Sequence, residues 1–173
     1  MFLKFFLDGK INLVIAVNLE RLYFLREDND LKQIDIANLL NIIQVNISNW
    51  ERTKEIIPLN KLNIYANYFN ISMDYIIKLS NNKKPTNNLD KLNSKLIGNN
   101  LKYIRKKYNI TQKELANYLN TSHSTISSYE SGKTMLLTSF AYQLCKKYNI
   151  SLDWLCGRSN IMYRTNNTKD LMN

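Results

Sequence analysis

The stretch Thr111–Lys133, TQKELANYLNTSHSTISSYESGK, carries the clearest structural pattern of the sequence. Three of its apolar residues recur at the spacing of one helix face: Leu115, Ala116 and Leu119. Thr111 and Glu114 form a capping box, in which two side chains bind free backbone N–H groups at a helix start. Asn120 follows, and asparagine tolerates the left-handed backbone conformation of a tight turn. The stretch therefore begins with a short helix and a sharp turn.

A second helix is expected after the turn, because Ser122 is a good helix cap. Ile126 and Tyr129 lie three residues apart in this helix and point inward. The opposite face is small, polar and uncharged, and it consists of His123, Ser124, Ser127 and Ser128, with Thr125 at its margin. Such a face fits the DNA major groove and offers hydrogen bonds to the base edges.

The pattern TQxELAxxLNxSxSTISxYExGK resembles the helix-turn-helix of the Cro/CI family, the lambda-repressor-like or XRE DNA-binding domains. The resemblance extends from Ile97 to Ser159 and includes Ser151–Leu155, which is similar to the closing helix of that family. It implies an all-α domain that binds double-stranded DNA.

An internal repeat extends the prediction to the rest of the chain. A shift of 79 residues lays Leu22–Asn81 on the second half without a gap, so that Arg26 falls on Arg105 and Gln33 on Gln112. This period is too long for a solenoid unit and indicates duplicated domains. The predicted fold is all-α, with two tandem five-helix lambda-repressor-like domains joined by a polar linker.

The predicted boundaries follow from the repeat and from composition: N-terminal extension 1–16, first domain 17–80, linker 81–94, second domain 95–160 and tail 161–173. The extension is either an extra helix or strand, or a segment upstream of a start codon at Val17. The linker is Asn-rich, with a short helix considered at 89–96. If flexible, it has a mean reach of roughly 20 Å. Two half-sites one DNA turn apart are separated by about 34 Å, which the extended linker can span. The tail is expected to fray.

The resemblance assigns roles to matching positions in both domains. Gln33 and Gln112, at the start of the second helix of each domain, are expected to bind DNA phosphate, as are Lys54 and Lys133. The base-reading candidates of the first domain are Gln44, Val45, Ser48 and Asn49, with Asn46 at the margin. Two structural ion pairs are expected, each joining the first helix to the end of the recognition helix: Arg26 with Glu51, and Arg105 with Glu130.

The first domain departs from the pattern in its caps. Lys32 replaces the Thr111 cap, and Asp30 with Gln33 is the substitute expected from the sequence. Ile43 replaces the Ser122 cap. Thr53 stands where the second domain has Gly132, which makes a left-handed helix ending harder.

The two domains also differ in charge. The first, 17–81, holds 7 basic and 8 acidic residues, whereas 95–160 holds 10 basic and 3 acidic ones. Because neutralising phosphates supplies much of the affinity for DNA, the second domain is expected to be the main anchor.

Composition argues against several other classes of protein. The net charge of +10 favours a polyanionic partner. Cys145 and Cys156 form no metal-binding or disulfide pattern, and with a single histidine no catalytic constellation is present. We therefore expect no enzyme activity, cofactor or metal. The apolar runs of residues 1–16 are too short for a membrane span, and a cytoplasmic protein is expected.

The predicted function is sequence-specific binding of double-stranded DNA by a transcriptional regulator, specifically a repressor. The alternative is a DNA-binding antitoxin or adaptor whose first domain holds a protein partner. A homodimer acting through the second domain and a monomer using both domains are both compatible with the sequence, and they read a palindrome and an asymmetric site respectively.

Overall fold

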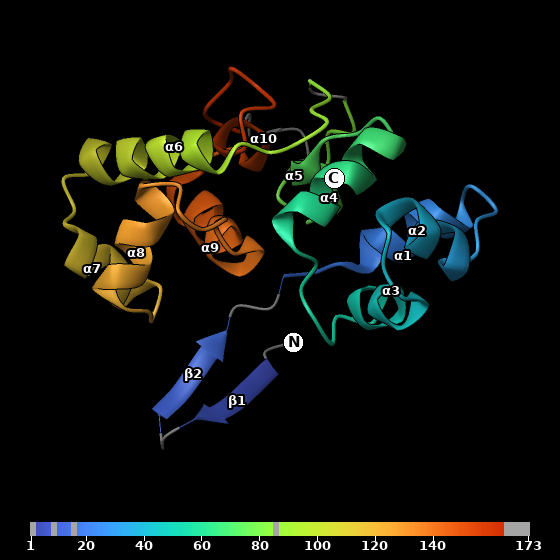
Figure 1. The fold of residues 1–173 in the computed structure, drawn as a ribbon, viewed down its shortest axis with the longest axis horizontal. Coiled ribbons are helices and arrows are strands. Elements are labelled where there is room, and N and C mark those ends of the chain that lie inside the picture. Colours follow the sequence, from blue (N-terminus) through green and yellow to red (C-terminus); the bar gives the residue numbers. More distant parts are fainter. Residues whose placement is uncertain (1–2, 8–9, 15–16, 85–86, 165–173) are drawn as a thin grey trace, which may run out of the picture.

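The computed structural model describes residues 3–7, 10–14, 17–84 and 87–164 (Figure 1). The N-terminal extension, for which a helix or a strand was considered, forms two antiparallel strands, β1 (Leu3–Leu7) and β2 (Lys10–Val14). From residue 17 onward the described elements are helices, as predicted. None of the described helices has the length and apolar character needed to cross a membrane.

The helices fall into two sets of five. Those of the first half are α1 (Glu20–Glu27), α2 (Gln33–Leu40), α3 (Gln44–Glu51), α4 (Leu59–Tyr68) and α5 (Met73–Ile76). Those of the second half are α6 (Ser94–Lys107), α7 (Gln112–Tyr118), α8 (His123–Glu130), α9 (Thr138–Tyr148) and α10 (Leu152–Leu155). Within each half two successive helices pack against one another, α2 against α3 and α7 against α8.

The backbone repeats with the same period as the sequence. Residues with positive φ in the described part form five pairs, each 79 residues apart and each just after a helix: Asp30 and Asn109, Asn41 and Asn120, Thr53 and Gly132, Asn70 and Asn149, Lys78 and Gly157. Positive φ is uncommon outside glycine, so this coincidence reflects a shared backbone course. The left-handed turn predicted at Asn120 is confirmed, with φ of 51°.

The helix caps of the second half match the sequence, whereas one expectation for the first half is wrong. Thr111 Oγ1 accepts a hydrogen bond from Glu114 N (3.1 Å), and Ser122 caps α8 through Thr125 N (3.1 Å). At α2, however, the Asp35 carboxylate accepts from Lys32 N (2.7 Å), and Asp30 instead adopts the left-handed turn conformation. Asp30 therefore belongs to the turn that ends α1 and does not cap α2.

The linker and the start of the tail are more ordered than predicted. The Leu89 carbonyl accepts hydrogen bonds from Asn63 Nδ2 (2.7 Å) and Asn67 Nδ2 (2.8 Å), and Asn87 N donates to the Arg158 carbonyl (2.8 Å). The linker is thus held by α4 on one side and by the second half on the other. The short helix considered at 89–96 begins only at Ser94, as the start of α6.

The first residues of the tail also pair with the second half. Ser151 N donates to the Met162 carbonyl (2.8 Å), and Arg164 N donates to the Asn149 carbonyl (3.1 Å). The expected fraying therefore does not apply to residues 161–164, and 165–173 lie outside the described residues.

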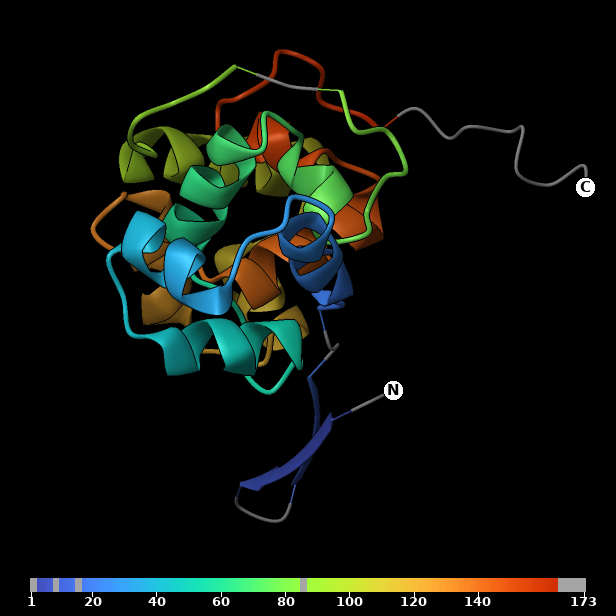
Figure 2. The ribbon, with the colours of Figure 1, turned by 90° about the vertical axis from the view of Figure 1, so that its right-hand side faces the viewer.

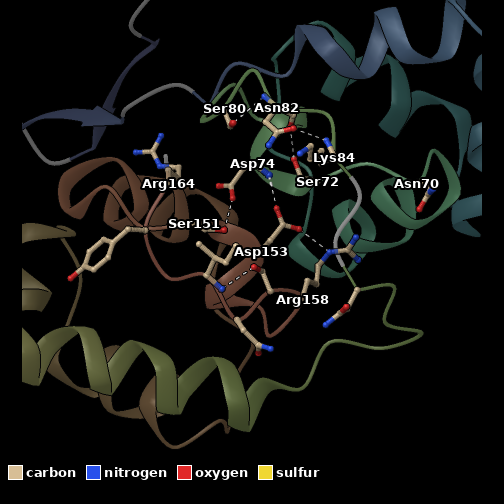
Figure 3. A pocket seen from close by; sticks show the side chains of 15 residues that line it. Asn70, Ser72, Asp74, Ser80, Asn82, Lys84, Ser151, Asp153, Arg158 and Arg164 are labelled. Carbon is tan, nitrogen blue, oxygen red and sulfur yellow. Dashed lines mark hydrogen bonds and ion pairs between the residues drawn. The ribbon is translucent and has the colours of Figure 1, made fainter. Parts of the chain in front are cut away.

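The two halves share one hydrophobic core and meet along a seam, which we define as the contact between α5 and α10. Figure 3 shows Asp74 of α5 and Asp153 of α10 beside one another there. Asp153 accepts hydrogen bonds from Met73 N and Asp74 N (both 3.1 Å), and Asp74 accepts from Leu152 N (2.8 Å) and Ser151 Oγ (2.5 Å). Both cysteines, Cys145 and Cys156, are free thiols buried in the core.

The seam gives a pH prediction. Burial, and then the charge of Asp153, raise the pKa of the Asp74 carboxyl to about 7, although Ser151, Leu152 and Arg164 act in the opposite direction. A raised carboxyl pKa favours the folded state below the unfolded pKa, near 4, and this contribution is lost as the pH rises through 7. Between pH 6 and 8 the free energy of unfolding should fall by about 1 kcal/mol.

The measurement is urea unfolding at pH 6, 7 and 8 for the wild type and Asp74→Asn. The amide keeps an acceptor for Leu152 N but does not titrate in this range. The same pH dependence in both proteins would exclude Asp74 as its source.

Candidate nucleic-acid interface

The α7–α8 unit presents the polar face of α8 to solvent. Its inner side is buried through Leu115, Ala116, Leu119 and Ile126. His123, Ser124 and Ser127 are exposed, whereas Thr125 and Ser128 are half-buried. Ser122 Oγ is within hydrogen-bonding distance of Ser124 Oγ and Thr125 Oγ1 (both 2.8 Å), which orders the start of the helix. The predicted base-reading residues are therefore gathered on one accessible helix face.

An ion pair joins α3 to α1, and an equivalent ion pair joins α8 to α6. Arg105 donates from Nε to Glu130 Oε1 (2.5 Å) and from Nη2 to Glu130 Oε2 (3.0 Å), and both side chains are largely buried. Arg26 binds Glu51 in the same way, at 2.6 and 3.0 Å. The carboxylate of Glu51 is the main cause of a raised pKa of Arg26, so this guanidinium stays charged. The two pairs hold α8 and α3 at matching orientations.

The glutamines expected to bind phosphate are also bonded to these ion pairs. Gln112 Nε2 donates to Glu130 Oε2, and Gln33 Nε2 donates to Glu51 Oε2, both at 2.8 Å. Both glutamines are half-buried at the start of their helices. Either glutamine could contact a phosphate only through the second N–H of its amide group, or by giving up its hydrogen bond to the glutamate.

The recognition face of α3 differs from that of α8. Gln44 and Val45 are exposed, and Asn46, Ser48 and Asn49 are half-buried. Arg52 Nη2 donates to Ser48 Oγ, and Asn49 Nδ2 donates to Glu55 Oε1 (3.1 Å). Gln44 Nε2 also donates to Gln33 Oε1 (3.5 Å), so three of the predicted base-reading side chains in the first half are engaged within the protein.

The predicted phosphate contacts Lys54 and Lys133 are exposed beyond the ends of α3 and α8. Three further charged residues lie in the same regions and were not predicted from the sequence. Arg52 and Glu55 contact the α3 face, and Lys95 Nζ donates to the Ser131 carbonyl at the end of α8 (3.3 Å). Arg52 and Glu55 closely follow the recognition helix in sequence, a signal that could have identified them, whereas Lys95 reaches α8 only through the packing of α6. Within the described residues no group of histidine, cysteine and carboxylate side chains is arranged to hold a metal ion.

Comparison with known proteins agrees with this geometry in the second half. Residues 101–155 match a family model described as helix-turn-helix. The chain is 31% identical over 67 residues to antitoxin PezA of Streptococcus pneumoniae, which covers 39% of this chain and 42% of that protein. It is 35% identical over 77 residues to the HTH-type transcriptional regulator ImmR of Bacillus subtilis, covering 44% of this chain and 59% of the relative.

The chain thus spans about half the length of these curated relatives. No solved structure gives a significant match. Residues 101–155 thus match a helix-turn-helix and include α8 with its exposed polar face, and the two relatives are described as a transcriptional regulator and an antitoxin.

Proposed function

We propose that the chain is a transcriptional repressor that binds double-stranded DNA sequence-specifically, with α8 in the major groove as its main anchor. The observation that carries this proposal is the helix-turn-helix match over α7–α8, whose exposed face is uncharged and polar. Side chains of this kind hydrogen-bond to base edges without the steric and electrostatic cost of large or acidic groups. The net charge of +7 over 95–160 supplies attraction to phosphate.

The proposal includes the domain organisation. The repeated backbone, the paired ion pairs and the matching helix order support two tandem five-helix domains, over 17–80 and 95–160. The base-reading side chains proposed for the second domain are His123, Ser124, Ser127 and Ser128, with Thr125 at the edge. For the first domain we propose Gln44, Val45 and Asn46, with Ser48 and Asn49 released from Arg52 and Glu55 when DNA is bound.

The test is a salt titration of the full chain on a duplex enriched from a random pool. Affinity should fall steeply between 50 and 200 mM salt, as it does for proteins that neutralise several phosphates. Lys133→Ala should weaken all duplexes alike and reduce the salt slope by about 1. Lys146→Ala removes the same charge from an exposed position on α9, outside the α7–α8 unit, and should have a smaller effect. Affinity that is nearly independent of salt would contradict the proposal.

A second candidate function is that of a DNA-binding antitoxin or adaptor, in which the first half holds a protein partner. Similarity to an antitoxin favours it, as do exposed apolar side chains of the first half. Tyr23 and Phe24 of α1 are 42% and 47% exposed, and their rings make an edge contact with centroids 5.4 Å apart. Ile43 and Val45, at the start of α3, are 69% and 52% exposed.

Co-expression with the product of the neighbouring gene separates the two functions. A stable complex that is lost on Tyr23→Ser and Phe24→Ser substitution would favour the antitoxin function. Operator binding by the chain without such a complex would favour an independent repressor.

A further inference from the structure

The contacts across the seam are reciprocal. Asp153 binds the first two N–H groups of α5, while Asp74 binds the first N–H group of α10 and the cap hydroxyl of Ser151. Asp74 and Asp153 are 79 residues apart, which is the period of the repeat. At a two-fold interface between identical subunits every contact occurs twice, once in each direction, because both subunits use the same surface. Here both sides belong to one chain.

The seam is also buried and extensive. Asp74 is 5% exposed and Asp153 1%, and apolar neighbours of both helices are fully covered. Further bonds between the halves reinforce it: Thr138 Oγ1 donates to the Ile57 carbonyl (2.6 Å), and Arg158 Nη1 donates to Asn63 Oδ1 (2.7 Å). The surface through which α5 or α10 could contact a second copy of the chain is therefore already occupied.

A two-fold relation between the halves would pair α3 with α8. The halves repeat the same order of helices and the same positive-φ positions, and they meet reciprocally at the seam. In Figure 1, α3 and α8 lie toward opposite sides of the molecule, both below α5 and α10. Figure 2 views the same arrangement from the side. The linker does not loosen it, because Leu89 is bonded to α4 and Asn87 to Arg158.

We propose that one chain is a complete intramolecular dimer, in which the seam sets α3 and α8 at a single fixed separation on one duplex. Its partner is a DNA site of two unlike half-sites, since α3 presents Gln44 and Val45 where α8 presents His123 and Ser124. This inference rests on the proposed DNA-binding function and adds stoichiometry, symmetry and spacing to it. One chain would occupy two half-sites, as two identical subunits do on a palindromic site.

The first experiment measures stoichiometry and the use of both helices. The full chain is bound to the duplex that it enriches from a random pool, and the mass of the complex is measured by sedimentation. One chain per duplex is expected. Val45→Glu and Ser124→Glu form a matched pair, 79 residues apart and exposed, so each adds a carboxylate without disturbing the core. Each should weaken the one-to-one complex by about tenfold or more, since the carboxylate opposes binding to polyanionic DNA.

The second experiment changes the spacing of the half-sites by inserting 5 or 10 base pairs between them. If the seam fixes the separation of α3 and α8, both insertions should weaken binding at least about tenfold. If the two halves were joined by a flexible tether, affinity would fall with an insertion of 5 base pairs and recover with 10, which is about one helical turn of DNA. Recovery at 10 base pairs, two chains on a palindrome, or an unaffected Val45→Glu would each overturn the inference while leaving the DNA-binding function intact. Absence of binding to any duplex would instead overturn the proposed function, and the inference with it.

Discussion

Glu130→Ala is expected to lower the free energy of unfolding by about 3–5 kcal/mol. The carboxylate is buried and accepts two hydrogen bonds from Arg105 and one from Gln112. Its removal leaves the Arg105 guanidinium largely buried without its counter-ion, which costs far more than the pair contributes when intact. The measurement is urea unfolding followed by circular dichroism.

The control for this substitution is Glu55→Ala, which removes an exposed carboxylate that accepts one hydrogen bond from Asn49. Its cost should stay below about 1 kcal/mol, as for other exposed charged groups. Equal losses for the two substitutions would show that Glu130 is not specially placed.

Gly98→Ala is expected to destabilise the protein by about 2–3 kcal/mol, although alanine is the better helix former by about 1 kcal/mol. A Cβ atom at Gly98 would lie 2.3 Å from the Tyr129 carbonyl oxygen and 2.8 Å from that of Glu130. Both oxygens belong to the backbone of the last turn of α8, so α6 would have to move away from α8. Because α8 is the proposed recognition helix, DNA affinity should fall together with stability.

The matched control is Asn99→Ala, the next residue of α6, which is exposed. Its free energy of unfolding should change by no more than about 0.5 kcal/mol, in either direction. If Gly98→Ala were as well tolerated as Asn99→Ala, the close approach of α6 to α8 would be incorrect.

The helix-turn-helix was predictable because its determinants are local. Thr111 and Glu114 cap one helix, Ser122 caps the next, and Asn120 takes the left-handed turn, all within one short stretch. The repeat then carried the same reading to the first half. In the first half Lys32 replaces the capping threonine, and the sequence suggested Asp30 as the substitute cap. The carboxylate that binds Lys32 N instead belongs to Asp35. An acid three residues after a cap is itself a local signal.

The seam was not predictable from local patterns. Asp74 and Asp153 each look like an acid in the first turn of a short helix, where a solvent-exposed carboxylate is ordinary. In the structure both carboxylates bind backbone N–H groups of the other half, 78 to 80 residues away in sequence, and Asp153 also accepts from Arg158 Nε (3.0 Å). The order of the linker was not predictable for the same reason. Its polar composition indicates flexibility, whereas in the structure Asn63 and Asn67 bind it through hydrogen bonds to the Leu89 carbonyl.

The recognition faces show the same limit. Periodicity predicted which side chains lie on the outer faces of α3 and α8, and these side chains are exposed or half-buried, but it gave no information about competing partners. Ser48 and Asn49 are bonded to Arg52 and Glu55, and Gln33 and Gln112 to the ion-pair glutamates. Which of these bonds give way to DNA depends on the complex and not on the pattern of the free chain.

The most direct test of the DNA-reading role of α8 is selection of duplexes from a random pool by the full chain, repeated with a Ser127→Ala, Ser128→Ala double variant. The wild type is expected to enrich a defined sequence. The variant should enrich a site altered at the positions that α8 reads, with each lost base preference worth about 1–3 kcal/mol. An identical enriched sequence for both proteins, or no enrichment by the wild type, would contradict the claim that α8 reads DNA through this face.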